Sequence, residues 1–275
     1  MRLPDPSVLL TLLEKDITLP AGLEALRARY LTAKPFPHLV LDGIFSERVL
    51  DDMVADLSEI EGEKWLNRDT EGFEQGIALR SAIDLRTTGF QFTALLHSAA
   101  FLYLLTAVTG IRELLPDPYL QGGGYHLMPP GSFFHVHVDR NVAYDTGLRR
   151  RLAMIIFLNK AWKPEYGGHL ELWSADCLRR EVAIEPTFNR TVIFEIARPN
   201  YHGVPVPIAC PVGRSRNSFL VYYHTVRTDG SEDIAPHSSI FAPRRENRVG
   251  TTDRRIASEC LPPVVFRPLR KLWGP

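Results

Sequence analysis

The chain has 275 residues, enough for one large domain or two small ones, and 45% of them are hydrophobic. This share of hydrophobic residues can form a substantial core, which argues against a disordered or low-complexity protein. Lys and Arg together number 32, as do Asp and Glu, so the formal net charge is zero. The chain therefore lacks the basic excess of a sequence-independent nucleic-acid binder.

The first third of the chain is predicted to be mainly helical. Apolar residues recur at helical spacing over residues 9–13 and again over residues 23–31. Residues 36–42 predict an apolar strand with a proline near its start, where one is tolerated. Ser46 then fits the N-cap of a helix that carries apolar residues from 49 to 57.

Two further stretches precede the second half of the chain. Residues 65–89 are rich in polar and turn residues and show no clear period, so we predict a long irregular loop. Long loops in compact domains are usually functional. Residues 92–108 predict one buried helix, because this apolar run contains His97 and Ser98 and is too short for a membrane span.

After about residue 117 the pattern becomes that of a β-protein. Short runs rich in β-branched and aromatic residues alternate with Gly, Pro, Asn and Asp clusters. The runs cover residues 132–138, 152–158, 169–173, 180–184, 191–196 and 218–223. This pattern predicts a mainly β (α+β) fold, a jelly-roll or cupin-like double sheet braced by the N-terminal helices.

We expect a single domain overall, in three parts. Residues 1–34 form a helical segment, residues 35–225 form the β-sheet domain with its supporting helices, and residues 226–275 form a tail that packs on it. Three widely spaced cysteines indicate reduced thiols rather than a disulfide framework. The first residues do not resemble a signal peptide, so we expect a cytoplasmic protein with neither nucleic-acid nor membrane partners.

The segment Gly131-Ser-Phe-Phe-His-Val-His-Val-Asp-Arg140 carries the candidate metal ligands. Alternate residues of a strand share a face, so His135, His137 and Asp139 are expected to point the same way. A His and a carboxylate two residues apart can bind one cation. His202, just after the predicted strand 191–196, is the best third ligand.

Two imidazoles and one carboxylate suit non-haem Fe(II) oxygen chemistry, because they leave three sites of an octahedron open. We prefer His137 to His135 as a ligand, although His135 remains open as its replacement or as a polar pocket residue. A His-x-Asp sequence alone is more often structural than metal-binding.

A second candidate site lies on the strand that begins at Arg216. Arg216, Ser218, Leu220 and Tyr222 are predicted to share one face. A buried arginine needs an anion, and its planar fork matches a carboxylate. Arg216 with Ser218 could therefore bind the far end of a dicarboxylic co-substrate. An internal ion pair or an exposed Arg216 is the alternative, and Arg214 competes for the role.

The order His137-x-Asp139, His202 and Arg216-x-Ser218 resembles that of the Fe(II)/2-oxoglutarate-dependent dioxygenases, in particular their prolyl-4-hydroxylase-like branch. Further similar segments are Phe157-Leu-Asn-Lys-x-Trp162, Gly167-Gly-His-Leu170, Ile184-Glu-Pro-x-Phe-Asn-Arg190, Thr191-Val-Ile-Phe194 and Tyr201-His-Gly-Val204. The resemblance extends from about residue 35 to residue 223.

This resemblance implies a double-stranded β-helix and an oxygenase. By resemblance, His137, Asp139 and His202 hold Fe(II), and Arg216 and Ser218 bind 2-oxoglutarate as co-substrate. The implied reaction uses O2 to hydroxylate an unactivated C–H of a prolyl, amino-acid or natural-product-type substrate, with release of succinate and CO2. The resemblance also implies that ascorbate can stimulate the activity.

Two positions depart from the family pattern. Phe157 stands where prolyl hydroxylases of this branch often have a tyrosine that helps to bind the co-substrate, and Tyr125 or Tyr222 is expected to compensate. His169 replaces the glutamate of a Gly-Gly-Glu-Leu segment, and we expect it near the surface. Asp139 favours hydroxylation, because halogenating relatives lack this carboxylate.

Two other functions compete with the oxygenase interpretation. One is a non-catalytic cupin-like binding protein, and the other is a metal-dependent hydrolase or isomerase with His135 as its base. The substrate, small-molecule or peptidyl, is not specified by the sequence. Candidate rim residues to which we assign no role are Arg80, Arg86, Arg140, Asn141 and Trp173.

Overall fold

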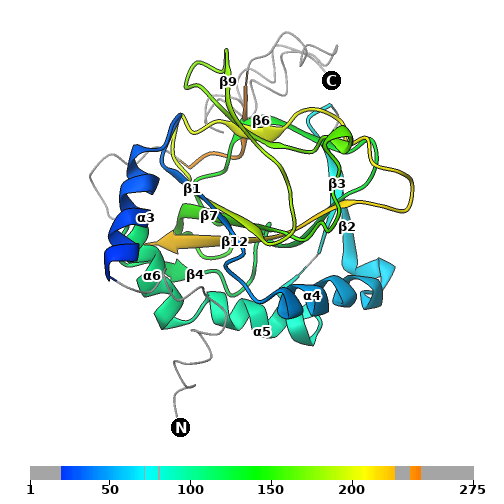
Figure 1. The fold of residues 1–275 in the computed structure, drawn as a ribbon, viewed down its shortest axis with the longest axis horizontal. Helices are drawn as coiled ribbons and strands as arrows, with labels where there is room; N and C mark the ends of the chain where they lie inside the picture. Colours follow the sequence, from blue (N-terminus) through cyan, green and yellow to red (C-terminus); the bar gives the residue numbers. More distant parts are fainter. Residues whose placement is uncertain (1–19, 71, 80, 227–235, 243–275) are drawn as a thin grey trace, which may run out of the picture.

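The structure is a computed structural model that describes residues 20–70, 72–79, 81–226 and 236–242. In this part of the chain, helices α3 (Pro20–Thr32), α4 (Glu47–Glu59), α5 (Thr87–Leu96) and α6 (Ala99–Thr109) lie against a curled antiparallel sheet (Figure 1). Short 3-10 turns occur at Gly62–Lys64, Ala82–Asp84 and Pro164–Tyr166. The predicted mainly β fold with N-terminal helices is therefore confirmed.

The strands of the sheet are β1 (His38–Asp42), β2 (Trp65–Thr70), β3 (Glu74–Leu79), β4 (Leu115–Pro116), β5 (Gly124–Met128), β6 (Phe133–Val138), β7 (Arg149–Phe157), β8 (Leu170–Trp173), β9 (Arg180–Ile184), β10 (Arg190–Glu195), β11 (His202–Val204), β12 (Arg216–Thr225) and β13 (Ile240–Phe241). Their order is β1-β10-β7-β12-β5-β3-β6-β11-β8-β9, and β2, β4 and β13 pair with β3, β12 and β6. Sequence neighbours are rarely sheet neighbours, so residues far apart in the chain meet around one curled surface.

Strand β12 shows how the two faces of the sheet divide. Phe219, Val221 and Tyr223 are fully buried in the core that helices α4, α5 and α6 share with the sheet. Burying a side chain of this size stabilises the fold by about 1.5–3 kcal/mol. The alternate residues of β12 point to the other side, into the hollow of the curled sheet.

The helix predicted over residues 92–108 is in fact two helices. Helix α5 ends at Leu96 and α6 begins at Ala99, where the Ser98 side chain accepts a hydrogen bond from the Phe101 N–H at 3.3 Å. Ser98 is thus an N-cap that starts a new helix direction. Among the described residues, no helix alone has the length and hydropathy to cross a membrane, and only this pair, bent by 52°, meets both criteria together.

The predicted loop over residues 65–89 was also wrong. Strands β2 and β3 form an antiparallel hairpin in which Trp65 pairs with Leu79 and Thr70 with Glu74. Strand β3 continues into the main sheet by pairing with β5 and β6. The hairpin places polar residues on the hollow side of the sheet, and this hides the apolar alternation by which strands are recognised in a sequence.

The remaining N-terminal predictions agree with the structure where it describes them. Residues 23–31 lie within α3, residues 38–42 form β1, and Ser46 directly precedes α4, although its side chain makes no cap hydrogen bond. The helix predicted over residues 9–13 lies outside the described residues. Of the predicted tail, residues 226 and 236–242 are described, and strand β13 pairs with β6.

Candidate metal centre

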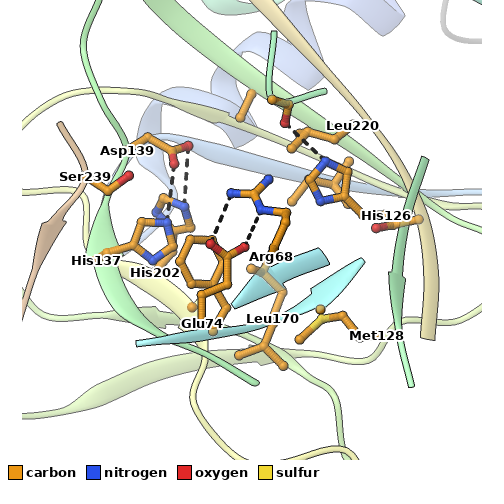
Figure 2. A pocket seen from close by; sticks show the side chains of 18 of the residues that line it. Arg68, Glu74, His126, Met128, His137, Asp139, Leu170, His202, Leu220 and Ser239 are labelled. Carbon is orange, nitrogen blue, oxygen red and sulfur yellow. Dashed lines mark hydrogen bonds and ion pairs between the residues drawn. The ribbon is translucent and has the colours of Figure 1, made fainter. Parts of the chain in front are cut away.

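A pocket opens on the hollow side of the sheet, with a volume of about 930 Å³ that includes its open mouth (Figure 2). Strand β12 contributes Arg216, Ser218, Leu220 and Tyr222 to its lining, so the predicted shared face of these four residues is what the structure shows. Strands β2, β3, β5, β6, β7 and β11 supply most of the other walls.

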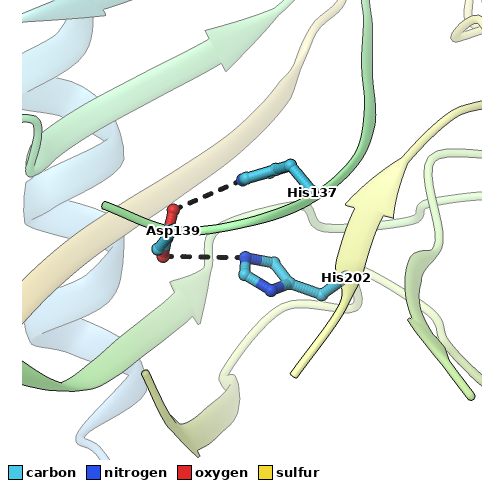
Figure 3. Close-up of side chains that lie close together, drawn as sticks. All are labelled: His137, Asp139 and His202. Atoms are coloured by element: carbon cyan, nitrogen blue, oxygen red, sulfur yellow. Dashed lines mark ion pairs between the residues drawn. The ribbon is translucent and has the colours of Figure 1, made fainter. Parts of the chain in front are cut away.

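Three buried side chains meet in this pocket (Figure 3). The Nε2 atom of His137 lies 3.3 Å from Oδ1 of Asp139, and Nε2 of His202 lies 3.6 Å from Oδ2 of the same carboxylate. Cross-strand pairing explains this meeting, because His137 on β6 faces His202 on β11 and their ring centroids are 4.6 Å apart. One ligand atom of each residue lies within 4.8 Å of the others.

The backbone determines which imidazole nitrogen faces the centre. Nδ1 of His137 lies 2.8 Å from the His135 carbonyl oxygen, and Nδ1 of His202 lies 3.2 Å from that of Asn200. A carbonyl only accepts, so each Nδ1 carries the hydrogen and each Nε2 presents a lone pair. Neither Nε2 atom therefore has a proton to donate to the carboxylate that it faces. A bound cation would stabilise this arrangement.

The charge states of the triad also fit a divalent cation. Burial lowers the pKa of His202 to about 4, so this imidazole is neutral at pH 7. Two imidazoles and one carboxylate are the donor set of a facial non-haem Fe(II) site.

His135 does not share the face of His137, contrary to the sequence prediction. Phe134 pairs with Val204 and His137 with His202, so three residue steps on β6 meet two on β11. This β-bulge breaks the alternation and stacks Phe134 on His137, with ring centroids 3.9 Å apart. The His135 ring lies near Phe133 instead, and it is not part of the pocket wall.

Arg216 is buried in the pocket wall with 4% of its surface exposed. Its Nε donates to the Gly168 carbonyl at 2.6 Å, and its guanidinium carbon lies 4.8 Å from the Phe157 ring centroid. Within the described residues no carboxylate pairs with it, and burial lowers its pKa to about 9. A buried cation in this state suits an anionic ligand.

Arg214, the competing candidate, lies elsewhere. Its guanidinium donates to the carbonyls of Lys160 and Ala161 and lies 5.9 Å from the Trp162 ring. It is not part of the pocket wall. Of the two arginines, the structure therefore brings only Arg216 to the triad's pocket.

The two tyrosines expected to compensate for Phe157 lie on opposite faces of the sheet. Tyr222 lines the pocket, and its hydroxyl lies 3.4 Å from Oδ2 of Asp139. Tyr125 is buried among the helices, where its hydroxyl donates to the Met53 carbonyl at 3.2 Å. The prediction that Tyr125 binds the co-substrate is therefore wrong, since a single residue step on β5 turned it away from the pocket.

The rim candidates are spread over different environments. Arg140 lines the pocket, whereas Arg86 forms an ion pair with Glu59 at 2.7 Å outside it. The Asn141 side chain accepts a hydrogen bond from the His237 N–H, and Trp173 is buried, donating to Glu171 at 3.0 Å. Arg80 lies outside the described residues.

Several pocket residues were missed by the sequence analysis. Arg68 and Glu74 come from the hairpin that was predicted as a loop, and they form an ion pair of 2.7 Å. Arg150, on β7, lines the pocket although its predicted strand began only at residue 152. The sequence offered one signal for these residues, which is the period-two alternation of polar residues in the hairpin. Arg68 faces the pocket as alternate residues of a strand do.

The fold and the site together define a class, a jelly-roll protein with a two-histidine, one-carboxylate metal centre. Residues 123–224 match the family model of the 2OG-Fe(II) oxygenase superfamily, and this region contains the triad, Arg216 and Ser218. Residues 123–224 are therefore similar to this superfamily. No curated protein sequence matches the chain significantly.

Solved structures show the same fold at low sequence identity. A prolyl-4-hydroxylase from Pseudomonas putida has 20% identity and a TM-score of 0.54, covering 75% of this chain and 100% of its own. A Trichoplax adhaerens prolyl hydroxylase, in complex with a hypoxia inducible factor peptide fragment, has 16% identity and a TM-score of 0.55, with coverages of 76% and 95%. The non-haem α-ketoglutarate-dependent carbocyclase of nogalamycin biosynthesis has 12% identity and a TM-score of 0.54, with coverages of 78% and 87%.

Proposed function

We propose that this protein is a 2OG-Fe(II) oxygenase, and specifically a hydroxylase that acts on an unactivated C–H of a prolyl, amino-acid or natural-product-type substrate. The balanced reaction converts substrate, 2-oxoglutarate and O2 into hydroxylated product, succinate and CO2. The observation that carries the proposal is that one pocket contains both the triad and a buried Arg216, which pairs with no carboxylate of the described residues. A site for a metal and a site for an anion thus adjoin.

His137, Asp139 and His202 would hold Fe(II), which supplies reductive activation of O2 coupled to decarboxylation of 2-oxoglutarate. Each ligand is oriented by its surroundings. The two backbone carbonyls described above hold the imidazole tautomers, and the Tyr222 hydroxyl donates to Asp139. Such supporting hydrogen bonds keep a metal ligand set in place.

Arg216 and Ser218 would bind the distal carboxylate of 2-oxoglutarate. The Phe157 ring supports the Arg216 guanidinium from one side, which is a role a phenylalanine can fill without a hydroxyl. Leu170 and Leu220 add apolar wall and restrict water at the site. Water exclusion strengthens the charge-assisted hydrogen bonds of Arg216.

The neighbouring structures do not specify a substrate, since they include both a peptide-bound prolyl hydroxylase and a carbocyclase of antibiotic biosynthesis. The hydrolase alternative loses support, because the base it would use, His135, does not line the pocket. A non-catalytic binding protein has no need of a complete ligand set beside a buried arginine.

The test is an anaerobic titration of the Fe(II)-loaded protein with 2-oxoglutarate. We expect the visible charge-transfer absorption of an Fe(II)–2-oxoglutarate chelate, and we expect His137→Ala to lose it together with iron binding. Arg214→Ala is the matched control and should retain the chelate. Iron binding without a chelate would refute the proposed function, whereas absence of iron binding would refute the ligand assignment.

A further inference from the structure

Three arginines other than Arg216 form a cluster that lines the pocket. Arg68, Arg140 and Arg150 all line it, and the Arg150 guanidinium packs against the Tyr222 ring. Tyr222 lies six residues from Arg216 along β12, which corresponds to about 20 Å in a strand. Arg150, beside Tyr222, therefore lies towards the end of the pocket away from the proposed co-substrate anchor, and Arg68 lies between the two ends (Figure 2).

Arg150 is held in place yet incompletely satisfied. It is 3% exposed, its Nη2 donates to the Gln121 carbonyl, and its guanidinium carbon lies 4.0 Å from the Tyr222 ring centroid. Its Nε is buried without a hydrogen-bond partner in the described part of the chain. The charge of Asp117 reaches Arg150, but these two residues form no ion pair within 4 Å.

Arg140 follows the Asp139 ligand directly and has no acceptor among the described residues. Its guanidinium carbon lies 4.5 Å from the Tyr144 ring centroid. Arg140 and Arg150 both line the pocket, so two like charges share this part of it. Crowded guanidinium groups are costly unless an anion joins them.

Arg68 reaches the same space from the hairpin. Glu74 holds it through Nε at 2.7 Å and Nη2 at 3.2 Å, and the pair is about three-quarters or more buried. In the view of Figure 2 this pair is drawn between the triad and His126. Glu74 neutralises one of the three arginines, so the cluster keeps two positive charges in excess.

Iron and 2-oxoglutarate do not remove this excess. Apart from Glu74, the only carboxylate among the described pocket residues is Asp139, a proposed metal ligand. A divalent cation and a dicarboxylate cancel each other, and Arg216 balances Asp139. The excess positive charge of the arginine cluster is therefore available to a second anion, the substrate.

We infer that the oxidised substrate carries an anionic group, a carboxylate or a phosphate, that binds between Arg140 and Arg68 with support from Arg150. This inference rests on the proposed function, because it assigns the substrate side of the same pocket. A planar carboxylate and a phosphate both accept paired N–H donors from guanidinium groups. An anionic group held there would place the rest of the substrate in the pocket that also contains Asp139.

The experiment measures probe binding to the anaerobic Fe(II)- and 2-oxoglutarate-loaded protein by calorimetry. Saturating 2-oxoglutarate occupies Arg216, and chelate absorption is recorded first, so that a failure of the proposed function is seen before any probe is added. The probes are benzoate and phenyl phosphate, with benzamide and phenol as neutral counterparts. The first pair distinguishes a carboxylate site from a phosphate site.

We expect at least one anion to bind tenfold or more tightly than its neutral counterpart. Arg140→Gln and Arg68→Gln, on separate elements, should each reduce that preference at least tenfold. Arg86→Gln is the matched control, because this arginine pairs with Glu59 outside the pocket. Equal binding of anionic and neutral probes, or a preference that both pocket variants retain, would overturn the inference while the chelate leaves the proposed function intact.

Discussion

Replacement of Arg216 by methionine should weaken 2-oxoglutarate binding without lowering the free energy of unfolding of the ligand-free protein. The reason is that the guanidinium is buried without a carboxylate partner in the described residues. Its charge destabilises the folded protein while 2-oxoglutarate is absent. Removal of a poorly compensated buried charge by an apolar side chain is commonly neutral or stabilising by about 1–4 kcal/mol. Loss of the hydrogen bond to Gly168 offsets about 1 kcal/mol of this gain. We therefore expect Arg216→Met to leave the ligand-free free energy of unfolding unchanged or to raise it.

The same variant should lose most of its stabilisation by 2-oxoglutarate. Truncation of one partner of a buried charge pair costs about 2–5 kcal/mol, which weakens binding by roughly 30-fold to several thousand-fold. At a concentration of 100 times the wild-type Kd, the ligand stabilises the wild type by about 2.7 kcal/mol. A 30-fold weaker variant gains about 0.9 kcal/mol under the same conditions.

Urea unfolding of the Fe(II)-loaded protein under anaerobic conditions, with and without 2-oxoglutarate, measures both quantities. Arg214→Met is the control, since Arg214 does not line the pocket and should leave the ligand's stabilisation intact. The reasoning is refuted if Arg216→Met loses more than about 2 kcal/mol without ligand and is still stabilised by 2-oxoglutarate as the wild type is.

Four other changes give measurable outcomes. Asp139→Ala should abolish stoichiometric iron binding, measured by metal analysis, while circular dichroism shows an unchanged fold; retained iron contradicts the triad. Gly203→Ala should lower the urea midpoint strongly, because its Cβ would lie 2.8 Å from the Phe134 carbonyl oxygen, and an unchanged midpoint argues against this close approach of β6 and β11. Phe241→Ala should raise the iron dissociation rate measured by chelator competition, because its ring centroid lies 5.7 Å from that of His137 and the two rings are neighbours; an unchanged rate assigns Phe241 no such role. Burial lowers the pKa of His224 from 6.5 to about 4, so the unfolded chain takes up its proton first and stability falls as the pH drops from 6.5 towards 4. His224→Leu should remove about 2 kcal/mol of the loss between pH 7.5 and pH 5 in urea titrations, and an equal loss in both proteins excludes this histidine as its source.

Much of this protein was already determined by local sequence. Runs of β-branched and aromatic residues marked most of the long strands within a few residues of their observed ends, and the polar residues of β12 marked its pocket face. The candidate ligands His137, Asp139 and His202 were recognisable because metal chemistry restricts both residue type and spacing. Period-two alternation and ligand chemistry are local properties, and the sequence displays them directly.

The rest depended on how distant segments meet. The bulge that removes His135 from the ligand face arises from pairing of β6 with β11, two strands more than 60 residues apart in the chain. The polar hairpin β2–β3 is stabilised as part of a larger sheet, so its own sequence lacks the signal of an independent strand pair. The arginine cluster likewise forms only when the hairpin, the segment after β6 and β7 converge on one pocket. Register and charge proximity are properties of the closed sheet, and for that reason only the tertiary structure decided them.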